Sequence, residues 1–175
     1  APRIAALVLA AGQSRRMGRA NKLLAEIEGV PMVARVANAV SASKADPVVV
    51  VLGHQSDGVR QCLADTPATF VDNPAYAEGL STSLTAGLAA LPDDIDGVVI
   101  CLGDMPRVRA DEIDRLIAAF DLEDGRAICV PTHLGKRGNP VLWAKRFFDE
   151  MSDLRGDVGA RHLIGEYEEL VAEVE

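Results

Sequence analysis

The sequence predicts an α/β protein built on a mostly parallel sheet. Short, uninterrupted apolar runs are typical of strands buried on both faces, and segments with helical periodicity separate these runs along the chain. The length of 175 residues fits one domain, so we expect residues 1–175 to form a single unit. Because strands and helices alternate, right-handed crossovers place helices on both sheet faces, which gives a three-layer α/β/α architecture.

Six segments have the composition of strands. Three of them are continuous apolar runs, a fourth is shorter, a fifth has the character of an edge or connecting strand, and the last alternates in polarity. In that order, the segments are Ile4–Leu9, Pro47–Leu52, Gly97–Leu102, Ala127–Val130, Ala68–Val71 and Leu170–Val174.

Six further segments have helical patterns. The clearest places Ile113, Leu116 and Phe120 on one stripe, and another begins with Pro31 near its first turn, where the missing N–H is harmless. The expected helices are Pro31–Ser43, Ser56–Ala64, Ser81–Leu91, Ala110–Phe120, Trp143–Met151 and Val158–Ile164. We expect Trp143 to pack in the core or at an interface.

Composition and charge exclude several classes of protein. The net charge of -8 argues against a nucleic-acid ligand, and no apolar run reaches the length of a membrane span. The scattered cysteines Cys62, Cys101 and Cys129 have no metal-ligand spacing, and no segment has the pattern of a signal peptide. We therefore expect reduced thiols in a cytoplasmic protein with neither nucleic acid nor membrane as partner.

The loop after the first strand is the main functional candidate. In open α/β sheets ligands bind beyond the carboxyl ends of the strands, so the loops after Leu9, Val71 and Leu102 should converge on one crevice. In the first of these loops, Arg15, Arg16, Arg19 and Lys22 lie within eight residues of an otherwise acidic chain, which favours a small anion.

Neither familiar phosphate-binding motif fits this loop. Five residues separate Gly12 from Gly18, whereas a dinucleotide fingerprint needs Gly-x-Gly-x-x-Gly and a Walker loop needs four residues followed directly by Lys. The small residues Ala10, Ala11 and Gly12 still allow close approach of the backbone, whose N–H groups can bind an anion. Arg16 can hydrogen-bond phosphate oxygens in a bidentate manner. The alternative is a solvated basic loop with turn glycines.

The segment from Leu9 to Leu24 resembles the signature of the MobA-like nucleotidyltransferases. It reads Leu-Ala-Ala-Gly-x-Ser-x-Arg-Met-Gly-x-x-Asn-Lys-Leu-Leu, and every fixed position of that pattern is met. The resemblance implies a Rossmann-like GT-A fold in which this loop wraps a nucleoside triphosphate, with Arg16 and Lys22 on the phosphates. The nucleotide-binding residues implied in the loop are Leu9, Ala10, Ala11, Gly12, Ser14, Arg16, Gly18 and Lys22.

Asp104 is the expected metal ligand. It follows the third strong strand in Gly103-Asp104-Met105-Pro106, and Mg²⁺ in phosphoryl-transfer sites is usually held by one or two carboxylates and by phosphate oxygens. Taken alone, an Asp before a proline is more simply a capping residue, but the resemblance implies a Mg²⁺ site here. A second basic loop, Gly135–Leu142, runs into a strand and is expected to bind the second, phosphorylated substrate. Within it Asn139 stands where the family often has His, and its amide oxygen is the expected second metal ligand.

Two other segments resemble the family. Asn73, Gly79, Ser81 and Ser83 are implied to line the nucleotide, although Ser81 and Ser83 are equally suited to an ordinary helix N-cap. The segment Gly156–Arg161 also matches, with Asp157 more simply read as the cap of the next helix. His54, His133 and His162 are scattered, and we expect them to be ordinary surface or loop residues.

The resemblance favours the cytidylyltransferase branch, because Ala11 stands where guanylyltransferases tend to have Gly. It implies that CTP and molybdopterin are joined into the cytosine dinucleotide with release of pyrophosphate, with Mg²⁺ as cofactor and Arg16, Lys22 and Asp104 as catalytic residues. A molybdoenzyme would then receive the product. The alternatives are a guanylyl- or sugar-phosphate nucleotidyltransferase, an NAD(P)-dependent oxidoreductase, or an accessory protein that carries the cofactor.

Overall fold

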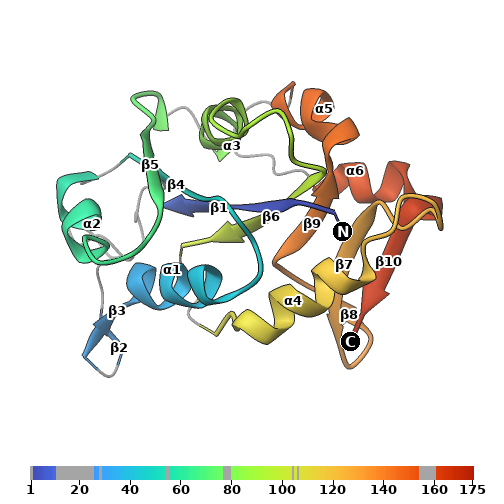
Figure 1. The fold of residues 1–175 in the computed structure, drawn as a ribbon, viewed down its shortest axis with the longest axis horizontal. Coiled ribbons are helices and arrows are strands. Elements are labelled where there is room, and N and C mark those ends of the chain that lie inside the picture. The colour runs from blue at the N-terminus through green and yellow to red at the C-terminus, as the bar shows by residue number, and fades with distance from the viewer. Residues whose placement is uncertain are drawn as a thin grey trace.

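The protein folds around one large sheet, which confirms the predicted α/β class (Figure 1). The computed structural model describes residues 2–10, 26–27, 29–53, 56–76, 80–103, 105, 107–153 and 161–175. Across the sheet the strands run in the order β10 (Val171–Val174), β7 (Ile128–His133), β9 (Val141–Ala144), β6 (Gly97–Leu102), β1 (Ile4–Ala10), β4 (Val48–Leu52) and β5 (Thr69–Asp72). The short β8 (Lys136–Arg137) pairs with β7, and β2 (Glu26–Ile27) with β3 (Val30–Pro31) forms a separate ribbon.

The sheet is mostly parallel, with one reversed strand near its centre. The pairs β6–β1, β1–β4, β4–β5 and β10–β7 are parallel, whereas β9 runs antiparallel to both β6 and β7. Because β9 is reversed, its first residue Val141 pairs with Ile100 near the carboxyl end of β6. The loop that leads into β9 therefore reaches the same sheet edge as the carboxyl ends of the parallel strands.

Helices cover both faces of the sheet, as the alternating pattern predicted. Figure 1 shows α3 (Leu80–Ala89) and α5 (Phe148–Ser152) on one face, and α1 (Met32–Ala42) and α4 (Ala110–Ala119) on the other. The remaining helical elements are α2 (Ser56–Cys62), α6 (Arg161–Glu166) and the 3₁₀ turns η4 (Lys145–Phe147) and η5 (Glu168–Leu170). None of the helices in the described ranges is long and apolar enough to cross a membrane.

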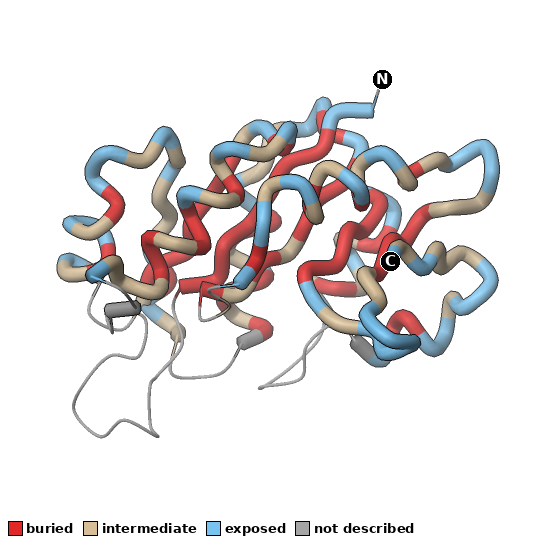
Figure 2. The backbone as a smooth tube through the Cα atoms, turned by 90° about the horizontal axis from the view of Figure 1, so that it is seen from below, coloured by how far each residue is buried: buried red, intermediate tan, exposed pale blue. Residues whose placement is uncertain are grey.

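The core lies between these layers. All seven residues of β1 are buried, which is why the run reads as continuously apolar, and Figure 2 shows the buried segments gathered in the central strands. Helix α3 sits unusually close to the sheet at Gly87, where a Cβ atom would lie 2.9 Å from Val51 Cγ2 and 3.0 Å from Leu7 Cδ1. This close packing fixes where α3 begins relative to the ends of β1 and β4.

The predicted helix Trp143–Met151 is wrong in its first half. Trp143 belongs to β9, where all four residues are buried, and the α-helix begins only at Phe148. A four-residue apolar run does not distinguish a buried strand from a buried helix, and the pairing with β6 and β7 decides it here. The expectation that Trp143 packs in the core is confirmed, since its ring meets Phe147 edge-on at 6.1 Å.

Candidate nucleotide and acceptor site

The carboxyl ends of four parallel strands meet at one edge of the sheet. Beyond the last paired residues, the N–H of Gly103 donates to the carbonyl of Leu9 (3.0 Å), and the N–H of Asn73 donates to the carbonyl of Leu52 (2.7 Å). The segments that follow β1, β5 and β6 therefore start from one edge, as the strand order required.

The predicted loop residues divide into two groups. Leu9 and Ala10 end β1 with buried side chains, so only their backbone is available to a ligand. The remaining predicted residues of the loop, and with them Gly79 and Asp104, lie outside the described part of the chain, so their roles stay predictions. Those loop residues are Ala11, Gly12, Ser14, Arg16, Gly18 and Lys22.

Asn73 ties the end of β5 to the start of α3. Its Nδ2 group donates to Thr82 Oγ1 (3.0 Å) and to Ser83 Oγ (2.9 Å), while its Oδ1 accepts from the N–H of Ala75 (3.0 Å). The side chain is buried, so these contacts are made away from solvent. Thr82 Oγ1 in turn donates to the carbonyl of Ala75 (3.0 Å), which closes the network.

These contacts give Asn73 and Ser83 a positioning role. Both amide hydrogens and the carbonyl oxygen of Asn73 have partners within the protein, and Ser81 and Ser83 are also buried. The network holds the first turn of α3 at the crevice edge of the sheet. Whether Asn73, Ser81 and Ser83 also touch the nucleotide stays a prediction.

Asn139 lies beside the carboxyl end of β6, where the reversed β9 brings it. Together with Met105, Arg107, Val108 and Glu112 it lines a cavity of about 340 Å³. Its side chain makes no hydrogen bond with the described residues. Met105 is the next residue after Asp104, so the second basic loop and the predicted metal ligand belong to the same edge of the sheet.

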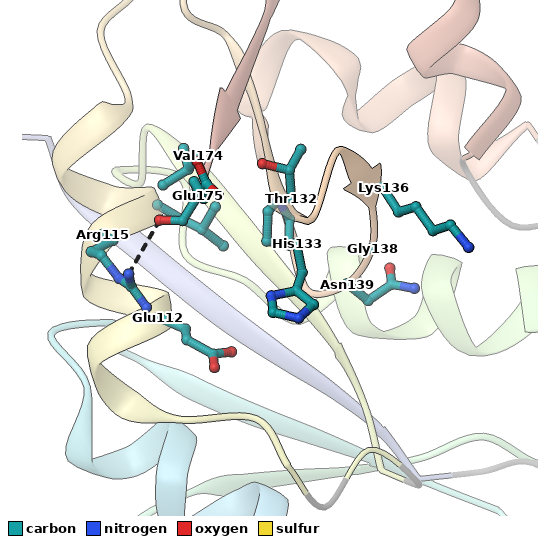
Figure 3. Close-up of a pocket in the computed structure, with 11 residues that line it drawn as sticks. Glu112, Arg115, Thr132, His133, Lys136, Gly138, Asn139, Val174 and Glu175 are labelled. Carbon is teal, nitrogen blue, oxygen red and sulfur yellow. Dashed lines mark hydrogen bonds between the residues drawn. The ribbon is translucent and has the colours of Figure 1, made fainter.

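A second cavity of about 320 Å³ continues from Asn139 along α4 (Figure 3). Leu116, Pro131 and Val174 give part of it an apolar lining, and polar side chains stand around them. In Figure 3 the imidazole of His133 lies between the Glu112 carboxylate and the Asn139 amide. Glu112 and Asn139 line both cavities, so the two cavities adjoin, and together we call them the groove.

The hairpin that carries Asn139 is anchored by Arg137. Thr132 pairs with Arg137 across β7 and β8, and the Arg137 guanidinium contacts the carboxylates of Glu168 and, at 3.2 Å, Glu173. The hydrogen bond from Arg137 lowers the pKa of the Glu168 carboxyl below its usual range. This ion-pair cluster fixes the hairpin to η5 and β10, at the far wall of the groove.

The cysteines have no role in this site. All three are free thiols, and burial raises the pKa of Cys101 to about 12 and that of Cys129 to about 11. A thiolate nucleophile is therefore not formed at these two positions near neutral pH. Across the described ranges, no group of three His, Cys, Asp or Glu side chains could hold a metal ion by itself.

Sequence reasoning missed two residues of the groove. Glu112 reads only as a first-turn acid of a predicted helix, and His133 reads as an ordinary loop histidine. Both face the groove because β7 and β9 are neighbours and α4 packs across β7. Neither residue carries a sequence signal that separates it from a solvated surface side chain.

Comparison with known proteins identifies the family of this chain. A family model described as the MobA-like NTP transferase domain matches residues 6–170. The bifunctional protein GlmU of Kineococcus radiotolerans is 36% identical over 133 residues, which are 74% of this chain and 27% of that protein. GlmU of Desulfotalea psychrophila is 29% identical over 86% of this chain and 44% of its own. The chain thus spans less than half the length of these curated relatives.

Solved structures show the same fold. Rv0371c from Mycobacterium tuberculosis H37Rv is 26% identical with a TM-score of 0.86, covering 99% of this chain and 88% of that one. A nucleotidyl transferase from Methanothermobacter (Mth528) is 23% identical with a TM-score of 0.85, covering 100% and 88%. The family model and the shared fold together define a nucleotidyltransferase-type α/β domain. The chain belongs to the MobA-like NTP transferase family.

Proposed function

We propose that this protein transfers a cytidylyl group from CTP to the terminal phosphate of molybdopterin, releasing pyrophosphate. The observation that carries the proposal is the meeting of two half-sites at one sheet edge. The loop after β1 starts there, and the loop before β9, with Asn139, ends there beside the chain neighbours of Asp104. We further propose that residues 1–175 act as one domain and that the product passes to a recipient molybdoenzyme.

The nucleotide half is assigned to the loop after β1. Backbone N–H groups near Gly12 and Gly18, with Ser14, would bind the triphosphate, and the small Ala11 would let the backbone approach the base closely. Arg16 and Lys22 would contact the phosphates and stabilise negative charge on the departing pyrophosphate. The Asn73 network would hold α3, with Gly79, Ser81 and Ser83, against the nucleoside.

A divalent cation fits the side chains at the junction of the two halves. Asp104 would supply a carboxylate next to the phosphates, and the Asn139 amide has no hydrogen-bond partner among the described residues, so its oxygen is available. Oxygen ligands of this kind suit Mg²⁺, which when bound neutralises phosphate charge. A structure of Rv0371c in complex with manganese, 25% identical to this chain, supports the use of a divalent ion.

The proposed reaction is a direct displacement. An acceptor phosphate oxygen attacks the α-phosphorus of CTP in line with the bond to the β-phosphate, which breaks as pyrophosphate leaves. No covalent intermediate with the protein is required. The contribution of the chain is positioning and charge stabilisation, because the two substrates must meet within about 3–3.5 Å of each other.

A sugar phosphate is the second candidate acceptor. The groove next to Asn139 offers Glu112 and Thr132 as hydrogen-bonding groups, which could also serve hydroxyl groups of a sugar. Calorimetric titration with CTP, GTP, ATP and NADPH in the presence of Mg²⁺ tests the nucleotide assignment. We expect CTP to bind most tightly. A preference for GTP would indicate a guanylyltransferase, and a preference for NADPH would contradict nucleotidyl transfer.

Asp104→Ala tests the metal assignment. We expect this variant to keep the melting temperature of the wild type and to lose Mg²⁺-dependent turnover. Asp111→Asn is the matched control, because Asp111 pairs with Arg109 and Arg115 on the outer side of α4. Full Mg²⁺-dependent activity of Asp104→Ala would show that the metal is held elsewhere. Pterin binding without any pyrophosphate release would instead favour a carrier protein.

A further inference from the structure

Three hydrogen-bonding side chains in the groove along α4 have no partner among the described residues. Glu112, His133 and Asn139 come from three different elements and line one cavity (Figure 3). None of the three side chains has a hydrogen-bond or ion-pair partner within the described ranges. Nearby carboxylates differ in this respect, because Asp111 pairs with Arg109 and Arg115. A carboxylate, an imidazole and an amide left free in one cavity are available to a ligand.

Part of the lining of this cavity is apolar and lies next to these polar groups, since Leu116 is one helical turn from Glu112 and Pro131 is two residues from His133. Leu116 is fully buried beneath it, and Pro131 and Val174 complete the surface. A flat ring system could lie against these residues while one polar edge reaches the three hydrogen-bonding groups. A sugar is less well matched, because its hydroxyl groups project around the ring and would meet the apolar lining without partners. The cavity volume of about 320 Å³ is at the lower end of the range for small-molecule sites.

We propose that Glu112 determines acceptor specificity by binding the amidine edge of a pterin ring, an inference that rests on the proposed function. The exocyclic amino group and the adjacent ring N–H of a pterin are two neighbouring donors, which match the two oxygens of a carboxylate. His133 and Asn139 then hydrogen-bond further polar atoms of the ring. No bond to the ring forms or breaks, so this is a recognition site distinct from the reacting phosphate.

The arrangement of the two adjoining cavities sets the orientation of the acceptor. The first cavity, with Met105 and Arg107, adjoins the chain segment of Asp104, while the second ends at His133 and Val174. Glu112 and Asn139 stand where the two cavities join. The phosphate end of the acceptor lies in the cavity next to Arg107, and the heterocycle lies in the cavity next to His133. Arg107 supplies positive charge at the phosphate end.

The test is a fluorescence titration of the full chain with pterin at saturating CTP and Mg²⁺. We expect saturable binding to the wild type and a roughly 10- to 100-fold rise in Kd for Glu112→Gln, the range for loss of a charge-assisted hydrogen bond. Asp111→Asn, which removes the same charge one residue away, should leave Kd within about twofold.

A second ligand sharpens the test. Lumazine has an oxygen in place of the pterin amino group, so it should bind the wild type more weakly and be insensitive to Glu112→Gln. Equal pterin affinity of wild type and Glu112→Gln, or equal sensitivity of both ligands, would overturn the assignment of Glu112 while leaving cytidylyl transfer intact. Glucose 1-phosphate that binds in a Glu112-dependent manner, without pterin binding, would overturn the pterin site. The proposed function is judged separately, by pyrophosphate release from CTP with molybdopterin itself.

Discussion

Replacement of Asn73 by Ala should weaken both the fold and the nucleotide site. The substitution removes three hydrogen bonds from a buried position, two donated to Thr82 and Ser83 and one accepted from Ala75. At about 1 kcal/mol for each bond, the expected loss of stability is about 3 kcal/mol. For a chain of this length that corresponds to a fall in Tm of about 6–12 °C.

Two further variants separate the contributions of the individual hydrogen bonds to this loss of stability. Ser83→Ala removes only one of the three bonds and should cost about 1 kcal/mol. Asn73→Asp keeps the acceptor for the N–H of Ala75 and should retain part of the stability. Thermal unfolding followed by circular dichroism measures each step. A Tm of Asn73→Ala within 2 °C of the wild type (about 1 kcal/mol or less) would refute the reasoning.

The same variant separates positioning from direct contact. If Asn73 acts by holding the first turn of α3, then Asn73→Ala and Ser83→Ala should both raise KM for CTP, in proportion to their loss of stability. If Asn73 touches the nucleotide instead, Asn73→Ala should impair CTP binding far more than its stability loss indicates. Steady-state kinetics at a temperature well below both Tm values decides between these outcomes.

Three other predictions follow from the described contacts. Gly97→Ala places a Cβ atom 2.7 Å from the backbone oxygen of Trp143, so we expect a loss of about 2 kcal/mol in denaturant unfolding; an unchanged midpoint would contradict this close approach. Glu168→Gln should destabilise the protein at pH 7, because Arg137 lowers the folded-state pKa of Glu168. The difference in stability between wild type and Glu168→Gln should disappear as the pH falls below the ordinary pKa near 4.5 and through the lowered pKa of the folded state. Urea midpoints of the two proteins that differ equally at every pH would contradict this prediction. Finally, iodoacetamide at pH 8 should modify only the half-buried Cys62 in the native protein, as counted by mass spectrometry, and rapid modification of a second thiol would show that the core opens readily.

Most of the sheet can be predicted from the sequence. The runs at Ile4–Leu9 and Gly97–Leu102 are apolar throughout because both faces of these strands are covered, and that pattern is local. The reversed strand β9 is harder to predict, since its four apolar residues also fit the start of a helix. Its direction depends on pairing with β6 and β7, which are distant in sequence.

The sequence predicts one half of the candidate site and gives no signal for much of the other half. The loop after β1 carries a long motif, so the sequence predicts its residues directly, and their roles stay predictions. The groove at Glu112 and His133 has no motif, because its residues come from α4 and β7 and meet only after β9 inserts beside β6. Asn139 is predicted from the sequence as a metal ligand, and the fold shows the cavity neighbours that it has.

The central claim is that this chain joins a nucleotide to a phosphorylated acceptor, and pyrophosphate release tests it most directly. Purified protein should release pyrophosphate from CTP in the presence of Mg²⁺ and molybdopterin, with a product of the mass of the cytosine dinucleotide. Omission of the acceptor, or removal of the divalent ion with EDTA, should stop the release. Absence of pyrophosphate with CTP, GTP, ATP and UTP, tested with both molybdopterin and a sugar phosphate, would contradict the account.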